Sequence, residues 1–155
     1  MSEPAAGSRS LLCREGIRLC AIPLAHVIET MRPLPLAAFA GMPPFACGVS
    51  VIRGAPTPVV SLGGLLGAVG SPEPSRFVTV RTGPRTVALA VEEVVGVRDL
   101  SAAPLAELPP LLGEAAAEVV AAVGAVDAEL LVVLRSARWV PAEVWQAIEA
   151  EGPAQ

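Results

Sequence analysis

Short apolar runs that end at a glycine or a proline are the feature that most limits how this chain can fold. From Leu11 onward such a break occurs about every 8 to 12 residues. This spacing leaves room for strands joined by tight turns, and it is typical of β-sandwiches and β-barrels. We therefore predict a mainly β fold.

The runs in the first half of the chain are arranged as two hairpins. The first turn is at Gly16, where glycine supplies the positive φ that a tight turn needs. The second turn is at Arg53 and Gly54. The strands expected beside these turns are residues 11–14, 18–22, 46–52 and 56–62.

The same pattern returns in the second half of the chain. Residues 119–126 and 130–134 echo the second hairpin, around a turn at Asp127. A repeat of about 60 residues is near the minimum size for a separate β core, so we predict two similar β lobes, at about 11–67 and 76–140. Four residues of the first repeat recur 67 positions later: Gly16, Arg18, Ala21 and Val27 match Gly83, Arg85, Ala88 and Val94.

Helix is expected in two short places. Ser61 is suited to cap a turn over residues 62–67, because its oxygen can accept from the free amides of a first helical turn. Residues 1–10 are small and polar and are expected to form a flexible tail. A C-terminal helix is expected within 141–155, where four residues fall at i, i+3, i+4 and i+7: Pro141, Val144, Trp145 and Ile148.

Charge argues against nucleic acid as a partner. The chain has 11 basic and 15 acidic residues, a formal net charge of −4. A protein that binds phosphates without regard to sequence needs a basic surface, and this composition predicts none.

A mean hydropathy of +0.60 raises the question of a membrane span. Residues 33–52 are uncharged but hold four prolines, and residues 115–134 hold three acidic side chains. Neither segment suits a spanning helix. The N-terminus has no basic segment followed by an apolar one, and the three cysteines form no CxxC pair, so we expect a cytoplasmic protein in a reducing compartment.

The residues that carry out catalysis are scarce. His26 is the only histidine, and it has no Cys or Asp beside it in sequence. No phosphate-binding loop or nucleophile elbow is present, and Glu92 and Glu93 would point to opposite faces of a strand. We therefore expect no enzyme activity, no metal site and no cofactor.

One long segment is nearly free of charge. Residues 33–72 hold a single charged side chain, Arg53, at the expected turn of a hairpin. Exposed apolar surface with one arginine is typical of a partner-binding patch. A buried connector with a solvated arginine at the turn fits this segment equally well.

Five segments, taken together in their order along the chain, resemble the CheW-like chemotaxis coupling family. The resemblance covers about residues 11–140 and is carried by REGIRLCAIPLAHVIE at 14–29, PPFACGVSVIRG at 43–54, PVVSL at 58–62, VALAVEEV at 87–94 and the segment 124–134. It implies two SH3-like five-stranded barrels that can exchange segments. It also implies a non-enzymatic adaptor that bridges the cytoplasmic tips of chemoreceptors to the regulatory domain of a CheA-type histidine kinase.

The resemblance also implies which residues contact the receptor. Arg53 falls on the arginine of the family's LRG turn, and Glu29 falls on the glutamate of its VxE motif. Both motif positions are associated with receptor contact in that family. The apolar residues beside them in sequence are Val27, Ile28, Val51 and Ile52.

Two positions depart from the family pattern. Ser61 and Arg135 stand where the family commonly has aspartate. The kinase-binding residues stay unassigned, and a divergent member that binds receptors but engages the kinase poorly is the alternative. A small enzyme or ligand-binding β domain that has taken over the fold is the competing class, because a fold does not by itself imply a function.

Overall fold

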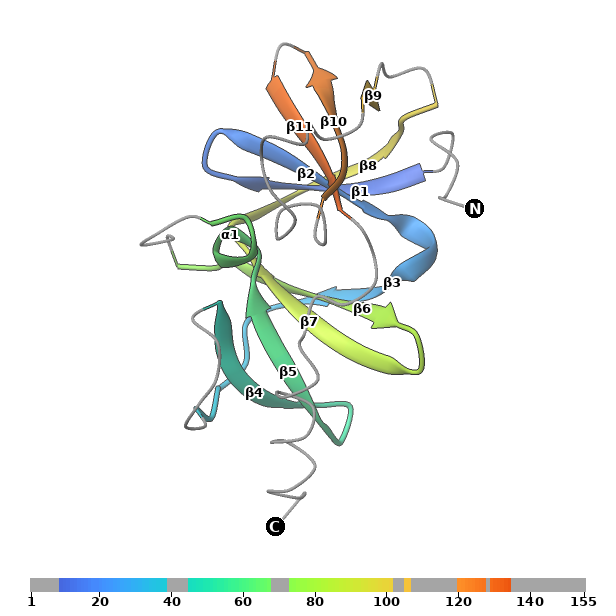
Figure 1. Ribbon diagram of the computed structural model, residues 1–155. Helices are drawn as coiled ribbons and strands as arrows, with labels where there is room; N and C mark the ends of the chain where they lie inside the picture. Colours follow the sequence, from blue (N-terminus) through green and yellow to red (C-terminus); the bar gives the residue numbers. More distant parts are fainter. Residues whose placement is uncertain are drawn as a thin grey trace.

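The computed structural model describes residues 9–38, 45–67, 73–101, 105–106, 120–127 and 129–134, and all structural statements below concern these residues. They form two sheets that lie one above the other in Figure 1. None of their helices has the length and apolar content that a membrane span requires.

Sheet A has six strands in the order β8-β1-β2-β11-β10-β9. Its neighbouring strands are antiparallel except for β2 and β11, which are parallel. Its strands are β1 (Arg9–Glu15), β2 (Arg18–Pro23), β8 (Glu93–Asp99), β9 (Leu105–Ala106), β10 (Val120–Val126) and β11 (Glu129–Leu134).

Sheet B has five strands in the order β3-β6-β7-β5-β4, with β5 and β7 parallel. A short 3-10 helix, η1 (Leu24–His26), leads from β2 into sheet B, and helix α1 (Leu62–Leu65) follows β5. The Ser61 hydroxyl accepts a hydrogen bond of 3.0 Å from the backbone N–H of Gly64, which confirms the predicted cap. The strands are β3 (Val27–Met31), β4 (Ala46–Ile52), β5 (Ala55–Ser61), β6 (Arg76–Thr82) and β7 (Arg85–Val91).

The predicted repeat is present as matching topology. A shift of 67 residues places β1 on β6, β2 on β7 and β3 on β8, and a shift of 74 places β4 on β10 and β5 on β11. With these equivalences the order of sheet B reproduces five strands of sheet A. The bulges also match, because the register skips Ile28 in β3 and Val95 in β8.

The sheets do not follow the sequence limits of the repeats. The hairpin β1–β2 lies in sheet A with the later strands of the second repeat, and the hairpin β6–β7 lies in sheet B with the later strands of the first. The two repeats have therefore exchanged their first hairpins. In addition, β1 begins at Arg9, inside the segment expected to be a tail, and Arg9 pairs with Asp99.

The expected closed five-stranded barrels need correction. Sheet A has six strands, and within the described residues neither sheet closes, since each order ends on two different edge strands. In sheet B, Ala37 pairs with the middle of the outer edge of β4. It exchanges two backbone hydrogen bonds, of 2.8 and 2.9 Å, with Val49. The segment after β3 thus takes the position that barrel closure would need. The mainly β fold itself is confirmed.

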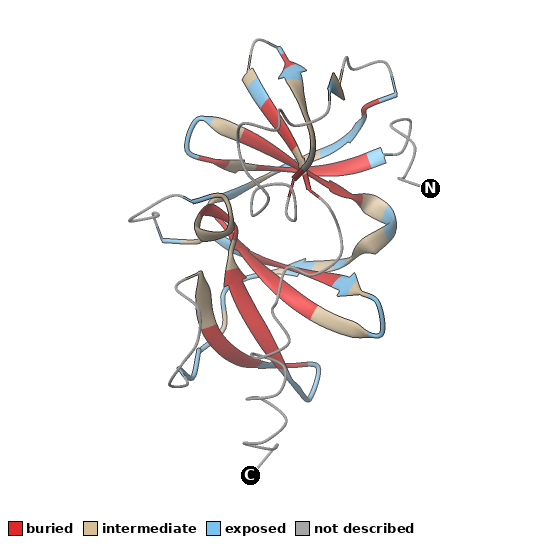
Figure 2. Ribbon diagram, in the orientation of Figure 1, coloured by how far each residue is buried: buried red, intermediate tan, exposed pale blue. Residues whose placement is uncertain are grey.

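Strands β1, β2 and β4 to β7 each contain at least three consecutive buried residues, shown red in Figure 2, so they bury side chains on both faces. In β7, Val87, Leu89 and Val91 enter a core shared by both sheets, whereas Ala88 and Ala90 enter a smaller cluster of sheet B alone. Strands β1 and β2 divide their side chains in the same way between the shared core and a cluster of sheet A. The shared core joins the two lobes into one packed unit.

The predicted C-terminal helix and Arg135 lie outside the described residues.

Candidate protein-binding site

Arg53 stands at the tip of the β4–β5 hairpin. Its φ is 54° and that of Gly54 is 79°, so both central residues of the turn have positive φ, as a type I′ hairpin turn requires. Glycine or asparagine adopts this conformation most readily, and an arginine there is strained. Strain of this kind is often found at functional positions. The turn leaves 78% of the Arg53 side chain exposed.

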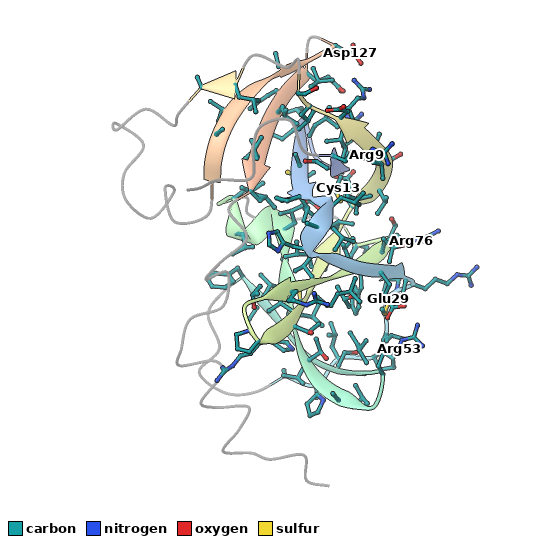
Figure 3. The ribbon with its side chains drawn as sticks, turned by 90° about the vertical axis from the view of Figure 1, so that its right-hand side faces the viewer. Arg9, Cys13, Glu29, Arg53, Arg76 and Asp127 are labelled. Carbon is teal, nitrogen blue, oxygen red and sulfur yellow. The ribbon has the colours of Figure 1, made fainter. Side chains whose placement is uncertain are left out.

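Glu29 follows the bulge of β3. The register changes from Val27 opposite Val80 to Glu29 opposite Thr79, so Ile28 is left without a partner. A bulge interrupts the strict alternation of side chains along a strand and re-aims those that follow. The Glu29 side chain is 26% exposed and faces the tip of the β4–β5 hairpin (Figure 3).

The structure brings the two predicted charges together. Arg53 Nε donates to Glu29 Oε2 at 2.9 Å, and Arg53 Nη2 donates to Glu29 Oε1 at 2.6 Å, a bidentate pair (Figure 3). These hydrogen bonds hold the pKa of the Glu29 carboxyl below its ordinary value and raise the pKa of Arg53. An exposed ion pair contributes little to folding stability. The pair is therefore a minor contributor to the stability of the fold.

The four apolar residues predicted beside the pair differ in exposure. Val51 is 69% exposed and Ile28 is 43% exposed, so both are available to a partner. Val27 is half-buried against the shared core. Ile52 is only 6% exposed and packs in the cluster of sheet B, because neighbours along β4 point to opposite faces. Ile52 supports the hairpin from beneath, and we leave it out of the proposed contact.

Sheet A carries a different ion pair at the matching hairpin tip, which the sequence analysis missed. Asp127 occupies the position of Arg53 in the repeat and shares its positive φ, at 51°. Arg98 Nη2 lies 3.5 Å from Asp127 Oδ2, so the charge at the hairpin tip is reversed relative to sheet B. Figure 3 places Asp127 far from Arg53, at the other end of the molecule. The matching turn positions in the repeat were the signal that could have revealed it.

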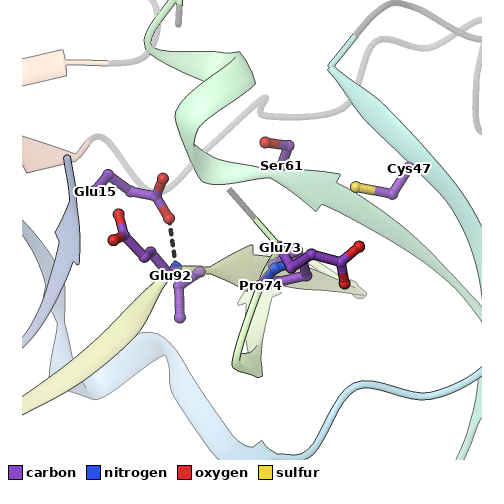
Figure 4. Close-up of a pocket in the computed structure, with 8 residues that line it drawn as sticks. Glu15, Cys47, Ser61, Glu73, Pro74 and Glu92 are labelled. Atoms are coloured by element: carbon purple, nitrogen blue, oxygen red, sulfur yellow. Dashed lines mark hydrogen bonds between the residues drawn. The ribbon is translucent and has the colours of Figure 1, made fainter. Parts of the chain in front are cut away.

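A pocket of about 240 Å³ lies near the junction of the two sheets (Figure 4). On one side Glu15 Oε2 accepts a hydrogen bond of 2.6 Å from the backbone N–H of Glu92, and Glu92 Oε1 accepts one of 2.8 Å from that of Gly16. Glu92 links β7 to β8, where the chain crosses from sheet B to sheet A. These reciprocal bonds fasten the crossover to the end of β1. The lining residues are Glu15, Cys47, Ser61, Glu73, Pro74, Ala90, Val91 and Glu92.

The pocket offers no pair of nucleophile and base among the described residues. Burial raises the pKa of the Cys47 thiol, which keeps it protonated and unreactive. The Ser61 hydroxyl is engaged as the helix cap. His26 lies in η1 and does not line this pocket. Within the described part of the chain, no three His, Cys, Asp or Glu side chains are grouped closely enough to hold a metal ion.

The burial of the Glu15 carboxyl leads us to expect that folding stability depends on pH. Its side chain is buried, and burial is the main reason that its pKa lies above the ordinary 4.5. The folded state therefore holds this proton more tightly than the unfolded state, so the free energy of unfolding should fall as pH rises from the ordinary pKa through the raised one. In Glu15→Gln this part of the decline should vanish, because the amide oxygen still accepts from Glu92 and carries no charge.

Urea titrations between about pH 4 and pH 8 measure this effect. The control is Glu93→Gln, which removes a neighbouring carboxylate whose side chain is 60% exposed. An unchanged pH profile in Glu15→Gln would contradict the prediction.

The fold and the exposed site together define a class of protein. Two equivalent β lobes share one core, and an exposed charge pair with apolar neighbours stands at the tip of one lobe. This is the arrangement of a protein-binding module.

The comparisons identify the family. Residues 9–143 match the CheW-like domain, and the chain therefore belongs to the CheW-like domain family, which confirms the resemblance. The fold is similar to the crystal structure of the scaffolding protein TtCheW from Thermoanaerobacter tengcongensis, with a TM-score of 0.73 and 18% sequence identity over 84% of this chain and 90% of that one. No curated protein gives a significant match. The family is one of scaffold and coupling proteins of chemotaxis.

Proposed function

We propose that this chain is a non-enzymatic coupling adaptor of a bacterial chemosensory system. In the cytoplasm it would join the signalling tip of a methyl-accepting chemoreceptor to the regulatory domain of a CheA-type histidine kinase. The observation that carries the proposal is the bidentate pair of Arg53 and Glu29 with exposed Val51 nearby in sequence.

The small contribution of the Arg53–Glu29 pair to folding stability supports the proposal. Its arginine is mostly exposed, and a surface ion pair contributes little stability, yet the turn holds that arginine at a strained positive φ. Apolar anchors with a flanking arginine suit a helical partner, whose apolar face covers Val51 and Ile28 while the charges set its register. A receptor tip, which is a helical hairpin, has this chemistry.

The test is a calorimetric titration of the full chain with a receptor signalling-tip fragment. Saturable binding supports the proposal, and absence of binding to the tip contradicts it. A second titration with the kinase regulatory domain separates a full coupler from a one-sided one.

The alternative is a divergent member that binds receptors but engages the kinase poorly. This alternative is based on Arg135, which stands where the family commonly has an acid. Unlike a carboxylate, an arginine side chain cannot accept a hydrogen bond from a backbone amide. The second departure is Ser61 in place of the family's aspartate. The serine is uncharged but still caps α1, so the cap is kept. The alternative therefore depends on Arg135.

This alternative makes its own prediction. The natural chain should bind the kinase domain about tenfold or more weakly than the receptor tip, and Arg135→Asp should raise kinase affinity, because it removes a positive charge and restores an acceptor. Ser61→Asp is the matched control and should change kinase affinity little. Tight kinase binding by the natural chain would exclude the alternative and leave an ordinary coupler.

A further inference from the structure

Thr79 is a buried polar residue beside the candidate site. It belongs to the buried run of β6 from Phe77 to Val80 and is itself 2% exposed. Its hydroxyl donates a hydrogen bond of 3.2 Å to the backbone carbonyl oxygen of Glu29. A hydroxyl in apolar surroundings is costly unless it is bonded, so this bond accounts for a threonine at that position.

The repeat supplies an internal control for the role of this hydroxyl. In sheet A the same bulge occurs at Val95, and there Leu12 takes the place of Thr79 and Gly96 takes the place of Glu29. Leu12 is apolar and 1% exposed. The bulge therefore forms without a hydroxyl beneath it. Of the two equivalent positions, only the one beside the acidic residue carries a hydroxyl.

The bond acts at the point where the Glu29 side chain leaves the backbone. The strand ladder is interrupted just before Glu29, because Ile28 has no partner. A bidentate carboxylate–guanidinium pair demands a well-defined orientation of both groups. We propose that Thr79 is a positioning residue for partner binding: its hydroxyl holds the Glu29 backbone so that the carboxylate meets Arg53 in the bidentate arrangement. The binding part of this inference rests on the proposed function.

The first test uses readouts that need no partner. Thr79→Val keeps the branched shape and removes the donor, whereas Thr79→Ser keeps the donor. Nuclear magnetic resonance would follow the Glu29 carboxyl titration and the exchange of the Arg53 Nε–H with water. In Thr79→Val the Glu29 titration should move up toward that of an ordinary glutamate and the Arg53 Nε–H should exchange faster, and in Thr79→Ser both should stay near those of the natural chain.

The second test measures binding to the receptor-tip fragment. Thr79→Val should weaken it by about 2- to 10-fold, the range expected for the loss of one hydrogen bond. Thr79→Ser should restore it. In a Glu29→Gln background, Thr79→Val should cause little further loss, because the group that Thr79 positions is no longer a carboxylate.

The outcomes separate the two proposals. If the natural chain does not bind the tip, the proposed function fails, and the resonance measurements still decide the role of Thr79. Unchanged Glu29 and Arg53 signals in Thr79→Val would overturn the positioning role. Thr79→Ala serves as a second donor-free variant, and loss of the folded state in both variants would overturn the proposal too, because the hydroxyl would then be required for the fold.

Discussion

Replacing Leu89 with alanine is expected to lower the free energy of unfolding by about 2–5 kcal/mol and to weaken both lobes together. Leu89 is fully buried in β7 and faces the core that the two sheets share. Truncation removes apolar contacts and leaves a cavity that close-packed neighbours refill only in part. Because side chains from both sheets line this core, the substitution should lower the stability of both sheets.

Thermal and urea unfolding followed at amides of β1 and β5 test this expectation. The transitions from the two sheets should coincide and should shift to the same lower midpoint in Leu89→Ala. Leu130→Ala is the matched control, because that leucine is 46% exposed and its truncation should cost only about 0.5 kcal/mol. Separate transitions for the two sheets would contradict a shared core.

Local signals explain why the strands and hairpins were predictable. Gly16 and Gly83 mark equivalent turns, and the apolar runs beside them become β1, β2, β6 and β7 within a few residues of the expected limits. The exchange of the first hairpins was predictable only as an implication of the family resemblance. Since β1–β2 and β6–β7 have the same pattern, either hairpin offers similar pairing to either sheet, and sequence pattern alone does not distinguish the two.

The candidate site was predictable in part for similar reasons. Arg53 and Glu29 were named from the resemblance, but their ion pair joins residues 24 positions apart and depends on a bulge that no local pattern reveals. The inclusion of Ile52 beside Val51 overlooked the alternation of side chains along a strand, which places the two on opposite faces. Thr79 could not be singled out at all, because its role depends on the register between β3 and β6.

Reversing the charge of Arg53 should have the largest effect on function. In Arg53→Glu two carboxylates would face each other at the hairpin tip, and affinity for the receptor-tip fragment should fall by about tenfold or more. The fold should persist, with a melting temperature within about 2 °C of the natural chain, because both side chains are on the surface. Arg98→Glu, which breaks the ion pair at the matching hairpin tip of sheet A, is the control and should leave tip binding nearly unchanged.

The double variant Glu29→Arg with Arg53→Glu decides how the pair works. It restores an ion pair between the same two positions, but with the charges interchanged. If the pair only held the hairpin in place, the double variant would recover full affinity, because an ion pair stabilises the hairpin equally well with its two charges interchanged. If the receptor reads the arginine at the tip directly, affinity should stay low although the pair has formed again. We expect the second result, since 78% of the Arg53 side chain is exposed and its turn presents it outward, and full recovery would show that the pair is structural.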